Sequence, residues 1–185
     1  MKLLPLITED HKHDYGCVML HFDFPEMNKI QDMINPDDIY EDENDDSFGL
    51  ETEAHVTLLF GLHDGVSTND IKKVLEKFEY GECKLTNPSI FENEKYDVFK
   101  YDVVYPTRGG AFLHKTNYEL KKLPHTSDFP KYNPHLTIAY LKPKKGSKYA
   151  KALKNKNSEF ILRPKYVTYS KSDGTKEKLN IKIKK

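Results

Sequence analysis

Residues 55–62 read HVTLLFGL, and residues 135–141 read HLTIAYL. Each stretch begins with His, an apolar residue and Thr, and each continues as an apolar run. Side chains of a β-strand alternate between its two faces, so the His and the Thr of each stretch share a face. Each stretch therefore predicts a strand that presents an imidazole and a hydroxyl on one side.

The rest of each strand is expected to follow the same alternation. Gly61 and Ala139 then lie further along the polar faces, where their small size would leave room for a ligand. Phe60 and Tyr140 fall on the opposite, apolar faces. We expect these apolar faces to pack into the core and to hold the polar pairs from behind.

The elements around the two stretches mix helices and strands. Residues 17–24 alternate as a half-buried strand, with Met19 and His21 on its less apolar side. Helices are predicted after Pro25, over 67–80, near 113–123 and near 147–155, and further strands near 82–91, 95–105, 159–170 and 178–184. This order predicts an α+β fold with a mostly antiparallel sheet, in two halves that each contain one His-x-Thr strand.

The composition limits the class of protein. The chain has 185 residues, of which 37% are hydrophobic and 31% charged, and this suits a single domain over 1–185. No apolar run approaches the roughly 20 residues of a membrane helix, and the apolar stretch at the N-terminus is too short for a signal peptide. Cys17 and Cys83 are therefore expected to be free thiols in the reducing cytoplasm.

The charge is unevenly distributed, although the net charge is zero. Residues 1–100 contain 9 basic and 23 acidic side chains, whereas residues 142–185 contain 15 basic and 3 acidic ones. A basic surface attracts phosphates, but a lysine run is as often only a solvated surface. Residues 37–46 carry seven acidic side chains in a long connection, which we expect to be mobile, functional or both. Such a segment would repel a long RNA and could cover a small nucleotide as a lid.

Two imidazoles and two hydroxyls suit phosphoryl transfer. In-line displacement at phosphorus needs a base on the nucleophile and an acid on the leaving oxygen, and two His residues fill these roles near pH 7. The Thr hydroxyls would donate to the non-bridging oxygens. A metal site that includes His55 and His63 is a competing interpretation, although the chain has no H-E-x-x-H and no Cys cluster. A further alternative is that both tripeptides only build strands.

The tetrapeptides HVTL at 55–58 and HLTI at 135–138 resemble the paired H-x-[ST]-x motifs of the two-histidine phosphoesterase superfamily. The resemblance implies two pseudo-symmetric lobes with mostly antiparallel sheets that flank a central cleft, and helices on the outside. It also implies a metal-independent phosphodiesterase without a cofactor. In that enzyme His55 and His135 act as acid and base, and Thr57 and Thr137 hold the phosphate.

Within that superfamily, the chain is most similar to phage-encoded hydrolases that degrade the cyclic di- and trinucleotide signals of CBASS antiviral immunity, such as cGAMP. The similar stretches are EAHVTLLFGL, FENEKYDVFKYDV and FPKYNPHLTIAYLKPKKGSKY. This implies hydrolysis of 3′–5′ bonds in the host cytoplasm by a monomer with no membrane and no stable long nucleic-acid partner. An enzyme for RNA 2′,3′-cyclic phosphate ends, a 2′–5′ RNA ligase-like enzyme and a protein that only sequesters a cyclic nucleotide remain alternatives.

A nucleotide ligand needs aromatic faces for its bases and cations for its phosphates. The candidates for substrate binding are Tyr40, Tyr132, Tyr169, Lys142 and Lys165. Tyr132 precedes the second motif, and Tyr40 lies in the acidic segment. Tyr166 and Tyr169 are three positions apart on one predicted strand, so only one of them can face the site.

Overall fold

The computed structural model describes residues 15–45, 47–106, 111–127, 131–155 and 160–184. The N-terminal apolar stretch and Asp46 lie outside this part. The strands are β1 (Gly16–Asp23), β2 (His55–Leu62), β3 (Glu79–Tyr80), β4 (Cys83–Glu92), β5 (Asp97–Val104), β6 (His135–Leu141), β7 (Phe160–Ser170), β8 (Lys176–Leu179) and β9 (Lys182–Ile183). The helices are α1 (Met27–Gln31), the 3-10 helix η1 (Pro36–Asp38), α2 (Thr68–Leu75), α3 (Phe112–Leu120) and α4 (Ser147–Asn155).

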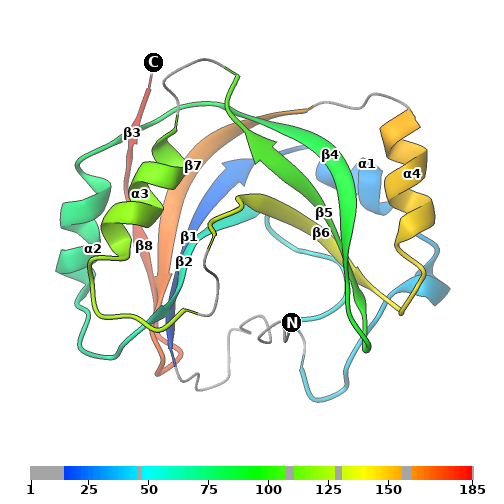
Figure 1. The fold of residues 1–185 in the computed structure, drawn as a ribbon, viewed down its shortest axis with the longest axis horizontal. Helices are drawn as coiled ribbons and strands as arrows, with labels where there is room; N and C mark the ends of the chain where they lie inside the picture. The colour runs from blue at the N-terminus through cyan, green and yellow to red at the C-terminus, as the bar shows by residue number, and fades with distance from the viewer. Residues whose placement is uncertain (1–14, 46, 107–110, 128–130, 156–159, 185) are drawn as a thin grey trace.

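One sheet dominates the fold, and its two ends meet. The strand order is β2-β1-β7-β4-β5-β6, β8 pairs with β7, and all of these pairs are antiparallel. Residues 163–170 of β7 pair with β1, whereas residues 160–162 pair with β4, so this long strand joins the two halves. The sheet curves until its outermost strands, β2 and β6, contact each other (Figure 1). The two His-x-Thr strands are therefore farthest apart in the strand order and yet in contact.

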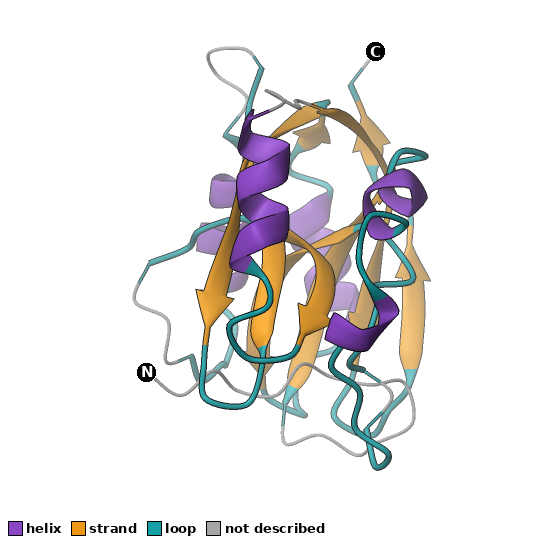
Figure 2. Cartoon of the chain, turned by 90° about the vertical axis from the view of Figure 1, so that its right-hand side faces the viewer, coloured by secondary structure: helices purple, strands orange, loops and turns teal. Residues whose placement is uncertain are grey.

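The helices lie on the outside of this curved sheet. α2 and α3 flank the half that contains β2, and α4 packs on β4 and β5 of the other half (Figures 1 and 2). Ser67 caps α2 through a reciprocal pair of hydrogen bonds with Asp70. α4 has the predicted bounds, and its residues Tyr149, Ala150 and Leu153 are buried.

The acidic segment borders β6. Tyr40 N donates to Tyr140 O at 3.0 Å, Tyr140 N donates to Gly49 O at 2.7 Å, and Glu51 N donates to Ile138 O at 3.0 Å. These bonds satisfy the outer edge of β6, which would otherwise expose unpaired backbone groups. The described part of the segment is thus an irregular border of the sheet, and it differs from the lid that the sequence suggests.

Asp38 connects this border to α4 through a hydrogen bond and ion pairs. Its carboxylate accepts a hydrogen bond from the hydroxyl of Tyr149 at 2.6 Å and pairs with Lys148 at 2.5 Å and Lys145 at 3.8 Å. The hydrogen bonds from Lys148 and Tyr149 hold the pKa of Asp38 below its usual value. The carboxylate therefore contributes to the structure, although it belongs to the stretch expected to serve a ligand.

A β-bulge interrupts β2 directly after the motif. Thr57 lies opposite Met19 of β1, but Leu59 lies opposite Val18, so Leu58 is an extra residue. A bulge exchanges the two faces of the strand beyond it. Phe60 therefore shares the face of Thr57.

β6 carries a bulge at the equivalent position. Thr137 lies opposite Lys100 of β5, but Ala139 lies opposite Phe99, so Ile138 is the extra residue. Tyr140 is thereby turned onto the face of Thr137. The two motif strands thus carry the same irregularity at the same distance from each motif.

The bulges overturn the predicted roles of the small residues. Ala139 is fully buried on the core side. Gly61 has a φ of +102°, and a Cβ there would lie 1.8 Å from the carbonyl oxygen of Thr126. Gly61 thus permits a close backbone contact and does not leave space for a ligand. Strict alternation was the wrong assumption beyond Thr57 and Thr137.

Cys17 and Cys83 are free and buried, and burial raises the pKa of each thiol to about 12. Within the described ranges, no helix has both the length and the apolar character needed to span a membrane.

Candidate functional site

His55 and His135 begin the two motif strands and are held in the same way. Nδ1 of His55 lies 3.0 Å from the carbonyl oxygen of Glu53, and Nδ1 of His135 lies 2.9 Å from that of Asn133. A carbonyl oxygen only accepts hydrogen bonds, so each Nδ1 carries a hydrogen and donates it. This leaves Nε2 of both rings to accept or release a proton.

The face of His55 continues onto β1. Met19 and His21 lie opposite Thr57 and His55, and the two imidazole rings are 5.7 Å apart. Nε2 of His21 is 2.8 Å from the hydroxyl of Thr168. Burial, followed by the charge of His55, lowers the pKa of His21 to about 4. His21 is therefore neutral at pH 7, and its ring, hydrogen-bonded to Thr168, packs beside the ring of His55.

The face of His135 continues onto β5. Asp102 and Lys100 lie opposite His135 and Thr137. Nζ of Lys100 is 2.5 Å from Oδ1 of Asp102 and 4.4 Å from the ring centre of Phe91, and its side chain is only 8% exposed. A nearly buried cationic side chain thus comes from the residue that lies opposite Thr137 on the neighbouring strand. The sequence showed Lys100 only as a polar residue of an alternating strand, because its cross-strand neighbours depend on register.

The charges around His135 favour its neutral form. Burial lowers its pKa, and the charges of Lys100 and His55 lower it further, while Asp102 and the bond to Asn133 oppose this. Burial alone would raise the pKa of Asp102, but its hydrogen bonds with Lys100 and Asn87 outweigh burial and lower it. Asp102 therefore stays ionised and partly neutralises Lys100.

Glu51 links the two motifs. Its backbone N–H donates to Ile138 of β6, and its carbonyl accepts from Nε2 of Gln31 at 2.8 Å. From this fixed position Oε1 of Glu51 lies 3.9 Å from Nδ1 of His55 on β2. Burial raises the pKa of Glu51, and the charge of His55 opposes that rise. Glu51 was not among the predicted site residues. It precedes His55 by four positions in a segment without regular structure, so the sequence gives no sign that the two side chains lie close together.

Tyr132 and Tyr40 serve packing and hydrogen bonding. The hydroxyl of Tyr132 donates to the carbonyl oxygen of Thr57 at 3.0 Å, so this side chain connects the loop before β6 with β2. Tyr40 packs against Phe48 and Tyr96, with ring centres 5.1 and 5.3 Å away. Both rings are thus engaged within the protein.

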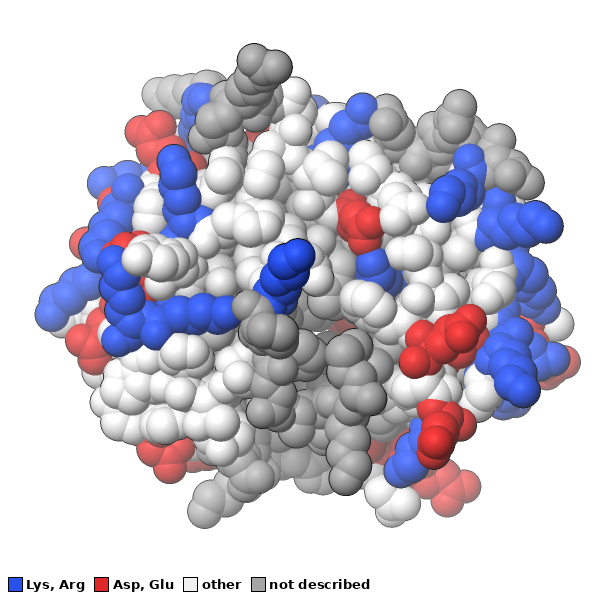
Figure 3. All heavy atoms as spheres, in the orientation of Figure 1, with Lys and Arg blue, Asp and Glu red and all other residues white. Residues whose placement is uncertain are grey.

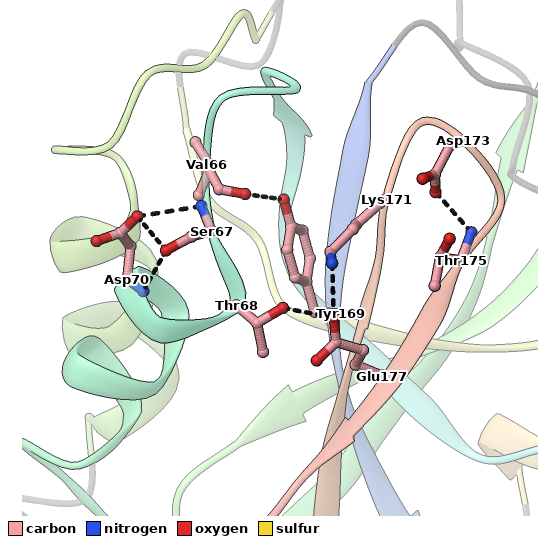
Figure 4. Close-up of polar contacts among 9 residues, drawn as sticks. All are labelled: Val66, Ser67, Thr68, Asp70, Tyr169, Lys171, Asp173, Thr175 and Glu177. Atoms are coloured by element: carbon pink, nitrogen blue, oxygen red, sulfur yellow. Dashed lines mark hydrogen bonds and ion pairs between the residues drawn. The ribbon is translucent and has the colours of Figure 1, made fainter.

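Tyr169 does not face the site. It lies opposite Val18 on the core side of β1, it is only 1% exposed, and its hydroxyl donates to Val66 O at 2.9 Å (Figure 4). The prediction for this residue was wrong. Tyr166 is on the opposite face, across from His21, and its ring stacks on that imidazole at 4.7 Å. The pairing of β7 with β1 decides between the two tyrosines.

The two candidate lysines lie in different surroundings. Nζ of Lys142 donates to the carbonyl oxygen of Asp37 at 2.7 Å, so it holds the border segment beyond the end of β6. Lys165 is exposed at a bulge in β7, and its charge helps to lower the pKa of His21. Of these two lysines, Lys165 is the one that acts electrostatically on the face of His55.

No group of three or more His, Cys, Asp or Glu side chains in the described residues is arranged to hold a metal ion. His63, the partner of His55 in the metal interpretation, lies just beyond the far end of β2. Its Nε2 is 2.9 Å from the hydroxyl of Thr126, and its ring stacks on Tyr15 at 5.9 Å.

Comparisons with known proteins identify the fold. No protein-family model matches the chain, and a search of curated sequences finds no match. Usb1 of Kluyveromyces marxianus has a TM-score of 0.56 at 12% identity, and the match covers 92% of this chain and 99% of that one. The same protein with uridine monophosphate has a TM-score of 0.52 at 10% identity, with coverages of 91% and 99%. LigT of E. coli complexed with 3′-AMP has a TM-score of 0.48 at 14% identity, with coverages of 91% and 96%. This TM-score is too low to support an argument.

Identities this low establish similarity of fold and nothing beyond it. The described elements are a mostly antiparallel sheet with a few helices outside it, and each of the two contacting strands carries one His-x-Thr motif. The chain therefore has an α+β fold similar to that of Usb1.

Proposed function

We propose that the protein is a phosphodiesterase that acts with side chains alone. The observation that carries the proposal is the matched anchoring of His55 and His135 on two contacting strands. Each donates from Nδ1 to a backbone carbonyl, and each has a Thr on the same face. Two imidazoles that both keep Nε2 available can serve as a base on one side of a phosphate and an acid on the other.

His135 acts as the base and His55 as the acid. Burial and Lys100 favour a neutral His135, which can take a proton. His55, whose Nδ1 lies 3.9 Å from the carboxylate of Glu51, is the remaining imidazole of the pair and takes the role of the acid.

The reaction then proceeds in line at phosphorus. Nε2 of His135 takes a proton from water as the water oxygen forms a bond to phosphorus. The bond between phosphorus and the ribose oxygen breaks, and that oxygen takes the proton from Nε2 of His55. Thr57, Thr137 and Lys100 hold the non-bridging oxygens, where charge is spread in the transition state. The product is one phosphate monoester and one ribose hydroxyl.

The substrate is a cyclic di- or trinucleotide immune signal, whose cleavage at a 3′–5′ bond would let a phage evade CBASS defence. The resemblance of the two motif regions to phage enzymes of that kind supports this choice. The solved Usb1 structure with uridine monophosphate supports a nucleotide ligand more generally. An acidic border along β6 also disfavours a long polyanion on that side. RNA with a 2′,3′-cyclic phosphate end is the alternative substrate.

One experiment tests the reaction and its substrate. The protein is incubated with 3′,3′-cGAMP and, separately, with a short RNA that ends in a 2′,3′-cyclic phosphate, and the products are analysed by mass spectrometry. We expect the cyclic dinucleotide to gain one water in the wild type, and far more slowly in His55→Ala and His135→Ala. Hydrolysis of the RNA end alone would overturn the substrate proposal. Tight binding of both ligands without any product would overturn the enzymatic one.

A further inference from the structure

The face that carries His55 extends across three more strands. On β7, Tyr166 lies opposite His21, and Thr168 lies opposite Lys178 of β8. Lys176 follows on the same side of β8, because alternate residues of a strand share a face. His55, His21, Tyr166 and the two lysines thus form a continuous row across β2, β1, β7 and β8.

The row is also continuous in space. The rings of His55 and His21 are 5.7 Å apart, the rings of His21 and Tyr166 are 4.7 Å apart, and Nζ of Lys178 is 3.9 Å from the ring centre of Tyr166. Three strand spacings separate β2 from β8, which is roughly 14 Å between backbones. Long lysine side chains shorten that distance.

Three exposed lysines rim this surface, and we call Lys165, Lys176 and Lys178 the lysine rim. The charge of each contributes to the low pKa of His21, so all three act electrostatically on the face beside the candidate site. Basic side chains gather on the flank of the molecule that contains β8 (Figure 3).

The acidic residue of β8 faces the other way. Glu177 lies between Lys176 and Lys178 in sequence and opposite Tyr169, on the core side of β7. Its carboxylate pairs with Lys171 at 2.6 Å and accepts a hydrogen bond from Thr68 (Figure 4). Alternation thus directs both lysines toward the site and the carboxylate away from it. On the site side, Glu53 has a carboxylate oxygen 3.1 Å from Nδ1 of His21.

We propose that the lysine rim binds a second phosphate group of the same ligand, while the motif threonines hold the phosphate that reacts. This rests on the proposed function. It names the substrate class as a nucleotide with at least two phosphodiester groups, because one phosphate cannot lie both beside His55 and on β8. A bound phosphate would draw Lys178 away from Tyr166, since an exposed cation–π contact is weak compared with a charge-assisted hydrogen bond to phosphate. The ring would then be open to a base.

The test compares ligands with one and two phosphates. Calorimetry measures binding of cyclic di-AMP and of AMP to the His135→Ala protein, which is expected to turn over the ligand far more slowly, and to the same protein with Lys176→Gln and Lys178→Gln. We expect the lysine changes to lower the affinity for cyclic di-AMP by about tenfold or more, because charge-assisted hydrogen bonds to phosphate are lost. The affinity for AMP should fall by less than about twofold. The salt dependence of cyclic di-AMP binding should also become shallower.

Matched controls separate position from net charge. Lys151→Gln with Lys154→Gln removes the same charge from exposed positions of α4 and should leave both affinities unchanged. Equal weakening of AMP and cyclic di-AMP by the rim variant, or no weakening of either, would overturn the second phosphate site. Failure of the proposed function gives a different result. The wild type would then yield no product, while the rim variant would still lose affinity for cyclic di-AMP but not for AMP.

Discussion

The hydroxyl of Tyr132 donates a hydrogen bond to the carbonyl oxygen of Thr57 at 3.0 Å, and so ties the loop before the second motif to the strand of the first. The two residues are 75 positions apart in the chain. This bond joins the two halves of the fold, whose histidines act on one phosphorus in the proposed reaction. A small shift between catalytic groups can cost a large part of the rate.

Tyr132→Phe is therefore expected to lower kcat several-fold with little change in KM. It should also lower the free energy of unfolding by about 1 kcal/mol, because the partly buried carbonyl of Thr57 loses a partner. Kinetics on the cyclic dinucleotide and urea unfolding measure the two effects. Tyr118→Phe is the control, since that side chain is 67% exposed, and an equal loss of kcat in both variants would contradict the positioning role.

His55→Ala and His135→Ala should each reduce the rate by at least about 10²-fold, the lower end of general acid–base contributions. Thr57→Ala and Thr137→Ala should cost less, because they remove one donor to phosphate. His63→Ala separates this mechanism from the metal interpretation. We expect His63→Ala to retain most of the activity. If His63 were a metal ligand, His63→Ala would lose as much activity as His55→Ala.

Glu51→Gln should lower kcat, because Oε1 of Glu51 lies 3.9 Å from Nδ1 of His55, the proposed acid. Burial raises the pKa of Glu51, so the contribution of its negative charge is lost as the pH falls and the carboxyl becomes protonated. Steady-state kinetics on the cyclic dinucleotide measure the effect. Glu43→Gln, in the exposed part of the same segment, is the matched control. An unchanged kcat in Glu51→Gln would show that the acid does not depend on this carboxylate.

Lys100→Gln should weaken substrate binding and shift the acidic limb of the profile to higher pH. Burial and Lys100 lower the pKa of His135, and the base has to be neutral, so removing the cation brings that pKa back toward its ordinary value. Lys95→Gln removes an exposed charge from the turn between β4 and β5 and should do neither. An unchanged acidic limb would exclude His135 as the base.

Asp38→Asn should destabilise the fold more at pH 7 than at pH 3. Hydrogen bonds from Lys148 and Tyr149 lower the pKa of Asp38 in the folded protein. A group with a lowered folded pKa stabilises above its unfolded pKa, and this contribution is lost as the pH falls through the folded value. Thermal unfolding at both pH values measures the difference. Asp37→Asn at the exposed neighbouring position should show no such pH dependence.

The sequence by itself determined the local elements and the reactive side chains. The tripeptides His-x-Thr predict which His and Thr share a face, because the first three residues of a strand alternate whatever lies beside them. Ser67 and Asp70 mark the start of α2 in the same local way, since a capping box needs only residues within one turn. The spacing of apolar residues also places α4 at its observed bounds.

The tertiary structure decided what surrounds those residues. Bulges at Leu58 and Ile138 turn Phe60 and Tyr140 onto the motif faces, and a bulge exists only in the pairing with a neighbouring strand. Register likewise puts Lys100 beside Thr137 and buries Tyr169 while Tyr166 faces His21. The proximity of Glu51 to His55 depends on an irregular segment that is hydrogen-bonded to β6. Each of these is a relation between segments distant in the chain, so hydrophobic pattern and local propensity contain no record of it, whereas the motifs needed only their own few residues.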